Sequence, residues 1–189
     1  MGRFLSIFVF VCFFFAHISA DGISVRHNAV KTTFLSWFSG SCKISYERAV
    51  FPHQTMELTA GYIGVGRDKY ENNPVGYTIR YAHKFMFFGN NVQPLNGAYL
   101  RPEFVYSNFR YNMKNHEGRM TSDMKSILIT LGYQYVVRRF VIDRYIGSGY
   151  AWGKEADTHY QHGFSLWDYF GSYRKNIAMT FGVKLGVSF

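Results

Sequence analysis

The last fourteen residues of the chain alternate without a fault between large apolar and small or polar side chains. From Asn176 to Phe189, every odd position is large and apolar, and every even position is small or polar. Side chains of a β-strand point alternately to its two faces, so this period of two predicts one long strand with one apolar face. Soluble strands usually have about 5 or 6 residues, whereas a tilted strand that crosses a bilayer needs about 9 to 11. The segment therefore favours a strand that crosses a membrane.

The same alternation recurs along the chain and defines eight predicted strands. They cover residues 25–36, 42–50, 55–66, 74–87, 96–111, 123–137, 139–152 and 175–189. Tight connections at 51–54 and 137–139 and a medium turn at 89–96 alternate with longer polar loops at 66–73, 112–122 and 153–175, although the connection at 38–41 is short. Short turns at one end and long loops at the other are typical of outer-membrane barrels. We therefore predict an all-β fold, an eight-stranded antiparallel up-and-down transmembrane β-barrel.

The first twenty residues have the features of an export signal. Arg3 supplies a positive charge, an apolar run follows from Phe4 to Phe15, and Ala20 is a small residue suited to cleavage. A spanning helix would need about 20 apolar residues, so we prefer a signal peptide at 1–20 to an anchor and assign the barrel to 21–189. Cys12 would leave with the peptide and Cys42 would remain alone, so no intramolecular disulfide is expected. These features predict location in the outer membrane of a Gram-negative bacterium.

Aromatic residues make up 20% of the chain and gather near the predicted strand ends. Amphipathic rings are favoured where hydrocarbon meets headgroups, so two belts are expected, the alternative being an ordinary β-core. The belt at the short-turn end would contain Phe85, Phe87, Phe88, Tyr135, Phe140 and Phe189. The belt at the other end would contain Trp37, Phe38, Phe109, Tyr111, Tyr150 and Trp152.

Three positions conflict with a regular barrel pattern. Arg144 falls on the predicted lipid face, where a charge costs about 2–4 kcal/mol at mid-membrane and less near the interfaces. Pro102 lies inside the fifth strand and cannot donate to the ladder, which suggests a bulge there. The third strand is ambiguous, because aligning Tyr62-Ile63-Gly64 with Tyr145-Ile146-Gly147 of the seventh strand would turn Glu57 outward. We therefore expect a bulge in one of these two strands.

Charged residues at inward positions are expected to form an ion-pair network. An eight-stranded barrel is just wide enough inside for side chains, so a general porin is disfavoured. Buried charges must find partners, and this favours a structural network that closes the barrel over its alternative, a proton or ion path. The predicted members are Lys43, Glu47, Arg80, Lys84, Arg101, Glu103, Asp143 and Lys184.

Catalytic and metal-binding motifs are weak in this chain. His162 and Ser165 could belong to a lipid-modifying enzyme of the lipid A deacylase or acyltransferase type, but their spacing does not suit two residues on one strand face. His159 and His162 lack a third metal ligand. The basic residues are scattered, which argues against nucleic acid. We therefore predict no catalytic residue, no metal and no cofactor.

The long loop at 153–175 is the main candidate for contact with a partner, because exposed aromatic side chains often mark binding surfaces. Its candidate contact residues are Tyr160, Phe164, Trp167, Tyr169, Phe170 and Tyr173. Basic residues of the outer loops would meet lipopolysaccharide phosphates. They are Arg110, Lys114, Arg119, Lys125, Lys154, Arg174 and Lys175. The expected function is non-enzymatic: a monomeric barrel whose loops serve adhesion, partner binding or envelope structure. The alternatives are the lipid-modifying enzyme and a soluble periplasmic barrel for a lipophilic ligand.

Several short motifs resemble those of the small outer-membrane barrels of Bacteroides-type bacteria, a domain family of unknown function. They are Asn28-Ala29-Val30-Lys31-Thr32, Ile44-Ser45-Tyr46-Glu47-Arg48 and the Gly-x-Lys-x-Gly-x-Ser-Phe ending at Phe189. The resemblance implies that Phe189 acts as an assembly signal read by the barrel-assembly machinery. It implies no catalytic residues.

Overall fold

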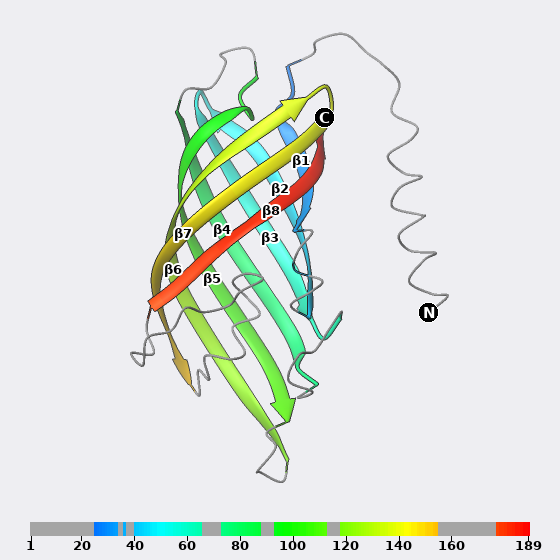
Figure 1. Ribbon diagram of the computed structural model, residues 1–189, viewed down its shortest axis with the longest axis vertical. Helices are drawn as coiled ribbons and strands as arrows, with labels where there is room; N and C mark the ends of the chain where they lie inside the picture. The colour runs from blue at the N-terminus through cyan, green and yellow to red at the C-terminus, as the bar shows by residue number, and fades with distance from the viewer. Residues whose placement is uncertain are drawn as a thin grey trace, which may run out of the picture.

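The protein is a closed β-barrel of eight antiparallel strands, as predicted (Figure 1). The computed structural model describes residues 25–33, 36, 40–65, 73–87, 93–112, 118–154 and 177–189. The strands are β1 (Asn28–Thr33), β2 (Ser41–Phe51), β3 (Gln54–Ile63), β4 (Val75–Phe87), β5 (Gly97–Asn112), β6 (Arg119–Val137), β7 (Phe140–Lys154) and β8 (Ile177–Ser188). Each strand pairs with its neighbours in the sequence, and β8 pairs with β1 to close the ring.

The described residues contain no helix with the length and apolar character needed to cross a membrane.

The barrel closes with a stagger of ten residues between its first and last strands. A path across paired residues runs from Ala178 through Gly149, Leu128, Glu103, Ala82, Glu57, Glu47 and Ala29 to Ser188. It returns to β8 ten residues further along, because 188 − 178 = 10. A stagger of this kind obliges the strands to tilt against the barrel axis, and the tilt is plain in Figure 1.

The two ends of the barrel differ in their connections. At one end, here named the turn end, Pro52-His53 joins β2 to β3 and Arg138-Arg139 joins β6 to β7. His53 and Arg138 have φ angles of 60° and 55°, the left-handed conformation that two-residue hairpin turns use. The C-terminal residues also lie at this end, where the Ser188 N–H donates to the Arg139 carbonyl at 2.8 Å. The opposite end, here named the loop end, receives the connections between β1 and β2, β3 and β4, β5 and β6, and β7 and β8.

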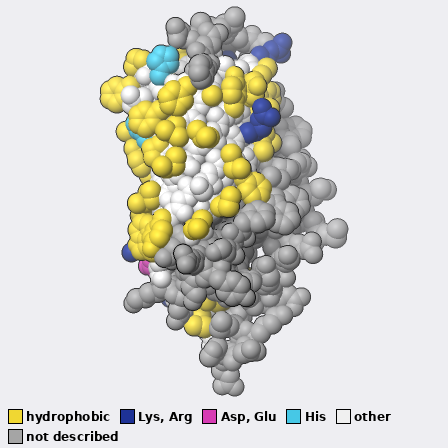
Figure 2. Space-filling view, turned by 60° about the vertical axis from the view of Figure 1, so that its left-hand side comes forward, with side chains coloured by type: hydrophobic (Ala, Val, Ile, Leu, Met, Phe, Trp, Pro, Cys, Tyr) yellow, Lys and Arg dark blue, Asp and Glu magenta, His cyan; other side chains and the backbone are white. Residues whose placement is uncertain are grey.

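The strands present mostly apolar side chains outward, whereas most of their polar and charged side chains face inward together with some apolar ones. Ile129, Leu131 and Ile146 are 59%, 60% and 60% exposed on the outer wall. Hydrophobic side chains cover much of the wall seen in Figure 2. The interior instead holds buried lysine, arginine, carboxylate, serine and threonine side chains. The barrel therefore has the reverse polarity of a soluble protein, in which apolar side chains are the ones most often buried.

Neither the third nor the seventh strand contains the expected bulge; the extra residue lies instead in β2, whose pairing with β3 shifts register between Ala49 and Phe51. β3 alternates regularly, and its pairing with β4 continues in one register from Gln54 to Ile63. β7 also keeps one register against both neighbours. The similar stretches at 62–64 and 145–147 place matching residues on opposite faces of the wall: Ile63 is buried inside, whereas Ile146 is exposed outside. Glu57 therefore points inward without a bulge in β3 or β7.

The bulge expected at Pro102 is also absent. The pairs Ala82↔Glu103 and Phe85↔Leu100 share one register on either side of Pro102, and Pro102 itself pairs with Ile129 of β6. Its ring is exposed on the outer wall. Pro102 interrupts the pairing between β4 and β5 locally, but the register of the two strands is the same on either side of it. The proline is accommodated by the loss of local pairing alone.

Two aromatic residues expected in the outer belt lie inside the barrel. Phe109 and Tyr111 are 1% and 2% exposed and pack with Ile63. Like Arg101 and Glu103, they occupy odd-numbered positions of β5. The odd-numbered side chains of this strand face inward, so strict alternation places Phe109 and Tyr111 inside. Tyr150 and Trp152 are exposed, as a belt requires. Residues 1–20, Trp37, Phe38 and Phe88 lie outside the described residues.

Candidate functional site

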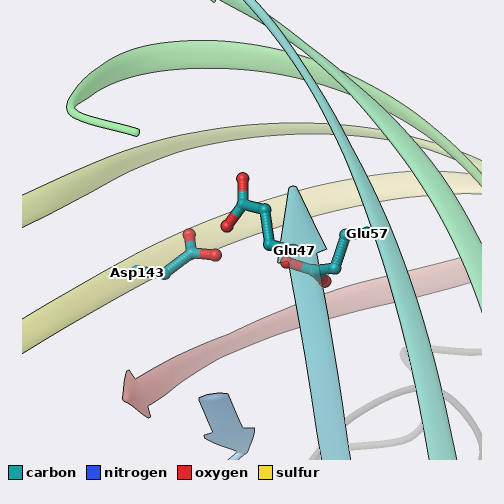
Figure 3. Close-up of side chains that lie close together, drawn as sticks. All are labelled: Glu47, Glu57 and Asp143. Carbon is teal, nitrogen blue, oxygen red and sulfur yellow. The ribbon is translucent and has the colours of Figure 1, made fainter. Parts of the chain in front are cut away.

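Three carboxylates from three strands meet inside the turn-end half of the barrel. Glu47 lies on β2, Glu57 on β3 and Asp143 on β7, and all three side chains are buried. One oxygen of each lies within 4.8 Å of the others, and Figure 3 shows the three groups gathered in the lumen. Each residue occupies an inward position within an alternating stretch of its strand. The closure of the barrel brings them together, because β7 and β2 are far apart in the sequence.

Two lysines contact all three carboxylates. The Lys31 Nζ lies 2.5 Å from Glu47 Oε2 and 2.9 Å from Asp143 Oδ2, and it also donates to Glu57. The Lys84 Nζ lies 2.8 Å from Asp143 Oδ2, 3.2 Å from Glu47 Oε1 and 3.3 Å from Glu57 Oε2. Three carboxylates alone would suit a hard divalent cation. Here the two ammonium groups already provide the compensating positive charge, and the arrangement is that of an ion-pair network.

Neutral side chains complete the hydrogen bonds of this ion cluster, which we define as Lys31, Glu47, Glu57, Lys84 and Asp143. The Gln134 carbonyl oxygen accepts from Lys84 at 2.7 Å and from Lys31 at 3.2 Å. The Thr55 hydroxyl donates to Glu47 at 2.5 Å. The Tyr99 hydroxyl donates to Asp143. Buried charges are tolerated when hydrogen bonds satisfy their remaining lone pairs, and these neutral groups meet that need.

A second layer of charge extends the cluster toward the loop end. Lys184 donates to Glu57, and Arg101 lies 3.6 Å from Glu57 and 3.1 Å from Glu103. Arg80 in turn lies 3.7 Å from Glu103. The Arg101 guanidinium also lies 4.6 Å from the centre of the Tyr145 ring, a cation–π distance. Ion pairs between described residues thus link seven of the eight strands across the lumen.

Two glycines provide the space that this packing requires. A Cβ at Gly132 would lie 2.3 Å from the Tyr99 ring, so a larger residue would displace the ring from Asp143. A Cβ at Gly186 would lie 2.6 Å from Lys31 Cγ. Contacts this short force a shift of the neighbour, and overpacking of this kind costs about 1–3 kcal/mol. The two glycines therefore help to position the side chains of the cluster.

Positive charge exceeds negative charge inside the barrel. The buried strand residues include six basic side chains, Lys31, Lys43, Arg80, Lys84, Arg101 and Lys184. They also include four acidic side chains, Glu47, Glu57, Glu103 and Asp143. These ten side chains give a formal charge of 6 − 4 = +2. Each carboxylate is therefore surrounded by more than one cation, and losing one carboxylate would leave several cations without compensation.

Apolar groups close the lumen on both sides of the charges. At the turn end, Leu95 packs with Ala29 and Val141. At the loop end, Ile63 packs with Phe109 and Tyr111. A third group, which includes Met124 and Leu128, lies between them. Side chains therefore occupy the interior along its length, as expected for eight strands.

All eight side chains predicted for the interior are buried there. Glu47, Lys84 and Asp143 meet in the ion cluster, and Arg101, Lys184, Glu103 and Arg80 lie in the layer beside it. Lys43 is buried beside Gly61. Phe189 is exposed at the turn end, where its N–H donates to the Asn28 carbonyl at 2.9 Å. The six aromatic residues proposed for loop contact lie outside the described residues.

The sequence analysis missed several members of the site, above all Lys31, Glu57, Tyr99, Gln134 and Tyr145. Lys31 had an available signal, because it alternates with Val30, which faces outward. Glu57 had a similar signal, because the apolar Met56 and Leu58 flank it. The comparison of the third strand with the seventh hides this signal, because aligning their similar stretches turns Glu57 outward. Gln134, Tyr99 and Tyr145 had the right parity, but only their contacts show that they belong to the cluster.

We expect Glu57→Gln to destabilise the folded barrel by about 3–5 kcal/mol, because it leaves Lys31, Lys84, Lys184 and Arg101 facing one negative charge fewer. Urea unfolding of the purified barrel in detergent micelles measures this change. Asp123→Asn is the control, because Asp123 lies 4.0 Å from Lys125 at a partly exposed site, and it should cost less than about 1 kcal/mol. Equal stability of the two variants would show that the ion cluster does not stabilise the fold.

Comparison with known proteins places the chain in a family. A family model described as a protein of unknown function (DUF3575) matches residues 6–188. No curated protein and no solved structure matches the chain significantly. The match covers all eight strands of the barrel. The chain therefore belongs to the DUF3575 family of proteins of unknown function.

Proposed function

We propose that the chain is an outer-membrane protein whose barrel spans the bilayer and anchors loops at the cell surface. The observation that supports this most is the reversed polarity of the wall, with large apolar side chains outside and charges inside. Water would penalise such an exterior, whereas hydrocarbon favours it. A closed barrel also pairs the backbone groups of its strands, which a spanning structure needs because lipid offers them no hydrogen bonds.

Features of the sequence and of the strand ends agree with this location. Residues 1–20 have the pattern of an export signal. Exposed aromatic side chains lie near both ends of the wall, with Tyr150 and Trp152 at the loop end and Tyr135 and Phe140 at the turn end. The motifs that resemble small outer-membrane barrels of Bacteroides-type bacteria support the same proposal. In it, the turn end faces the periplasm, and Phe189 is read by the barrel-assembly machinery.

The two alternative functions receive less support. A soluble carrier of a lipophilic ligand would need an apolar interior, but the described strands place ten buried charged side chains in the lumen. The lipid-modifying enzyme would use His162 and Ser165, which lie outside the described residues. No observation favours either alternative over the anchor. We therefore propose a non-enzymatic role without a cofactor.

The closed lumen supports the role of an anchor over that of a pore. Ion pairs and apolar groups occupy the interior, so a solute would have to displace paired charges to pass. The loops at the loop end then become the part that meets the surroundings. Arg110 and Arg119 are exposed at this end, where lipopolysaccharide phosphates would accept their hydrogen bonds. The aromatic loop at 153–175 is our candidate for contact with an extracellular partner of a monomeric barrel.

We expect the protein to remain in the envelope fraction after washing with alkaline carbonate and to require detergent for release. Immunoblots of washed membranes measure this, and a shift in gel migration on boiling reports the folded barrel. Recovery of the folded protein in the soluble fraction would contradict the membrane proposal.

We expect the barrel to form no steady open channel in planar lipid bilayers, because side chains occupy its lumen. Single-channel recording in potassium chloride, with a general porin as the positive control, measures the conductance. Long-lived openings of porin size would show that the ion cluster is displaced in the membrane and that the protein is a pore.

We expect cysteines at the two ends to react from opposite sides of the outer membrane. With Cys12 and Cys42 replaced by serine, Ser165→Cys in the long loop should react with an impermeant maleimide on intact cells. His53→Cys, which lies in an exposed hairpin turn at the turn end, should react only after permeabilisation. Labelling of His53→Cys on intact cells would reverse the proposed orientation.

A further inference from the structure

Arg144 is a charged residue on the apolar outer wall. It occupies an outward, exposed position of β7, between Ile142 and Ile146, which are exposed on the same face. Its cross-strand partners are Tyr133 of β6 and Val183 of β8. A guanidinium among such neighbours would be costly in hydrocarbon, so a specific compensation is required.

The Arg144 side chain extends toward the turn end. Its guanidinium lies 5.4 Å from the centre of the Tyr135 ring. Tyr135 pairs with Ile142, so this ring lies two residues nearer the turn than Tyr133, the direct partner of Arg144. Long basic side chains extend in this way toward the nearer membrane surface. The rings of Tyr133 and Tyr135 contact each other with centres 4.3 Å apart and planes tilted by 40°, so the guanidinium lies beside a pair of aromatic rings.

The described residues provide no carboxylate for Arg144. They include five acidic residues in all. Glu47, Glu57, Glu103 and Asp143 are buried inside the barrel, on the other side of the wall. Asp123 lies near the loop end of β6, where it is 4.0 Å from Lys125. No acidic side chain of the described residues therefore lies on the outer wall beside Arg144, which leaves its guanidinium open to an anion from the surroundings of the barrel.

We propose that Arg144 and Tyr135 form a binding site for the phosphate of an anionic phospholipid in the leaflet at the turn end. This inference rests on the proposed membrane location. A guanidinium matches phosphate with two parallel hydrogen bonds, and the tyrosine hydroxyl is a further donor at headgroup level. Arg48 and Arg138, both exposed at the turn end, add positive charge to the same side. A net negative headgroup is therefore favoured over a zwitterionic one, whose own ammonium group would be repelled.

Native mass spectrometry of the full chain, released from detergent micelles that contain defined lipids, tests the proposal. We expect the wild-type barrel to retain phosphatidylglycerol in preference to phosphatidylethanolamine. Arg144→Gln should weaken this retention about fivefold to tenfold, and Tyr135→Leu should weaken it less. Arg144→Lys should keep part of the lipid retention, because the lysine ammonium preserves the positive charge but cannot form the two parallel hydrogen bonds of the guanidinium. Tyr81→Leu, which removes an exposed tyrosine of β4 that pairs with Leu58 and Phe104, is the matched control for Tyr135→Leu and should leave retention unchanged.

Three outcomes would overturn the inference. They are equal retention of the two lipids by the wild type, equal retention of phosphatidylglycerol by Arg144→Gln, and full competition by inorganic phosphate alone, which would indicate a free anion. Migration on unboiled gels shows separately whether each variant is folded. Failure of the protein to enter membranes at all would instead contradict the proposed location. The two proposals therefore fail in distinguishable ways.

Discussion

The need to neutralise charge in a narrow, closed interior shapes this protein more than any other interaction. Eight strands leave room only for side chains, and the inward positions of several strands bear lysine, arginine or carboxylate groups. An uncompensated ion in such a space would be strongly destabilising. The barrel meets this need by placing Lys31 and Lys84 among three carboxylates that come from β2, β3 and β7. The cluster holds together strands that lie far apart in the sequence.

The same closure separates the chemistry of the two faces of the wall. The carboxylates that the structure describes in the turn-end half of the barrel lie inside, where they compensate the luminal cations. An outward arginine such as Arg144 cannot reach them across the sheet. It instead lies beside the aromatic ring of Tyr135. The described carboxylates that pair with luminal cations are thus not accessible to Arg144 on the outer wall. This separation links the interior packing to the lipid site that we propose.

Much of the fold follows from local sequence, because alternation is a property of each strand by itself. Strict parity along β5 places Arg101 and Glu103 inside, and the same parity places Phe109 and Tyr111 inside. The aromatic-belt argument was wrong for the latter two, because proximity to a strand end says nothing about which face a side chain occupies. The bulges expected in the third or seventh strand and at Pro102 were wrong for a related reason. Similar triplets in two strands can have opposite parity, and a proline that faces outward can be tolerated without a change of register.

The amino-acid sequence by itself determined the number of strands, the face of most residues and the apolar character of the outer wall, because a period of two is written in each strand. The tertiary structure alone decided which charges meet. Contacts between Lys31, Glu57 and Asp143 depend on the stagger with which β8 closes on β1, and that stagger depends on every strand pair at once. The space beside Tyr99 likewise exists only because Gly132 faces it from the neighbouring strand.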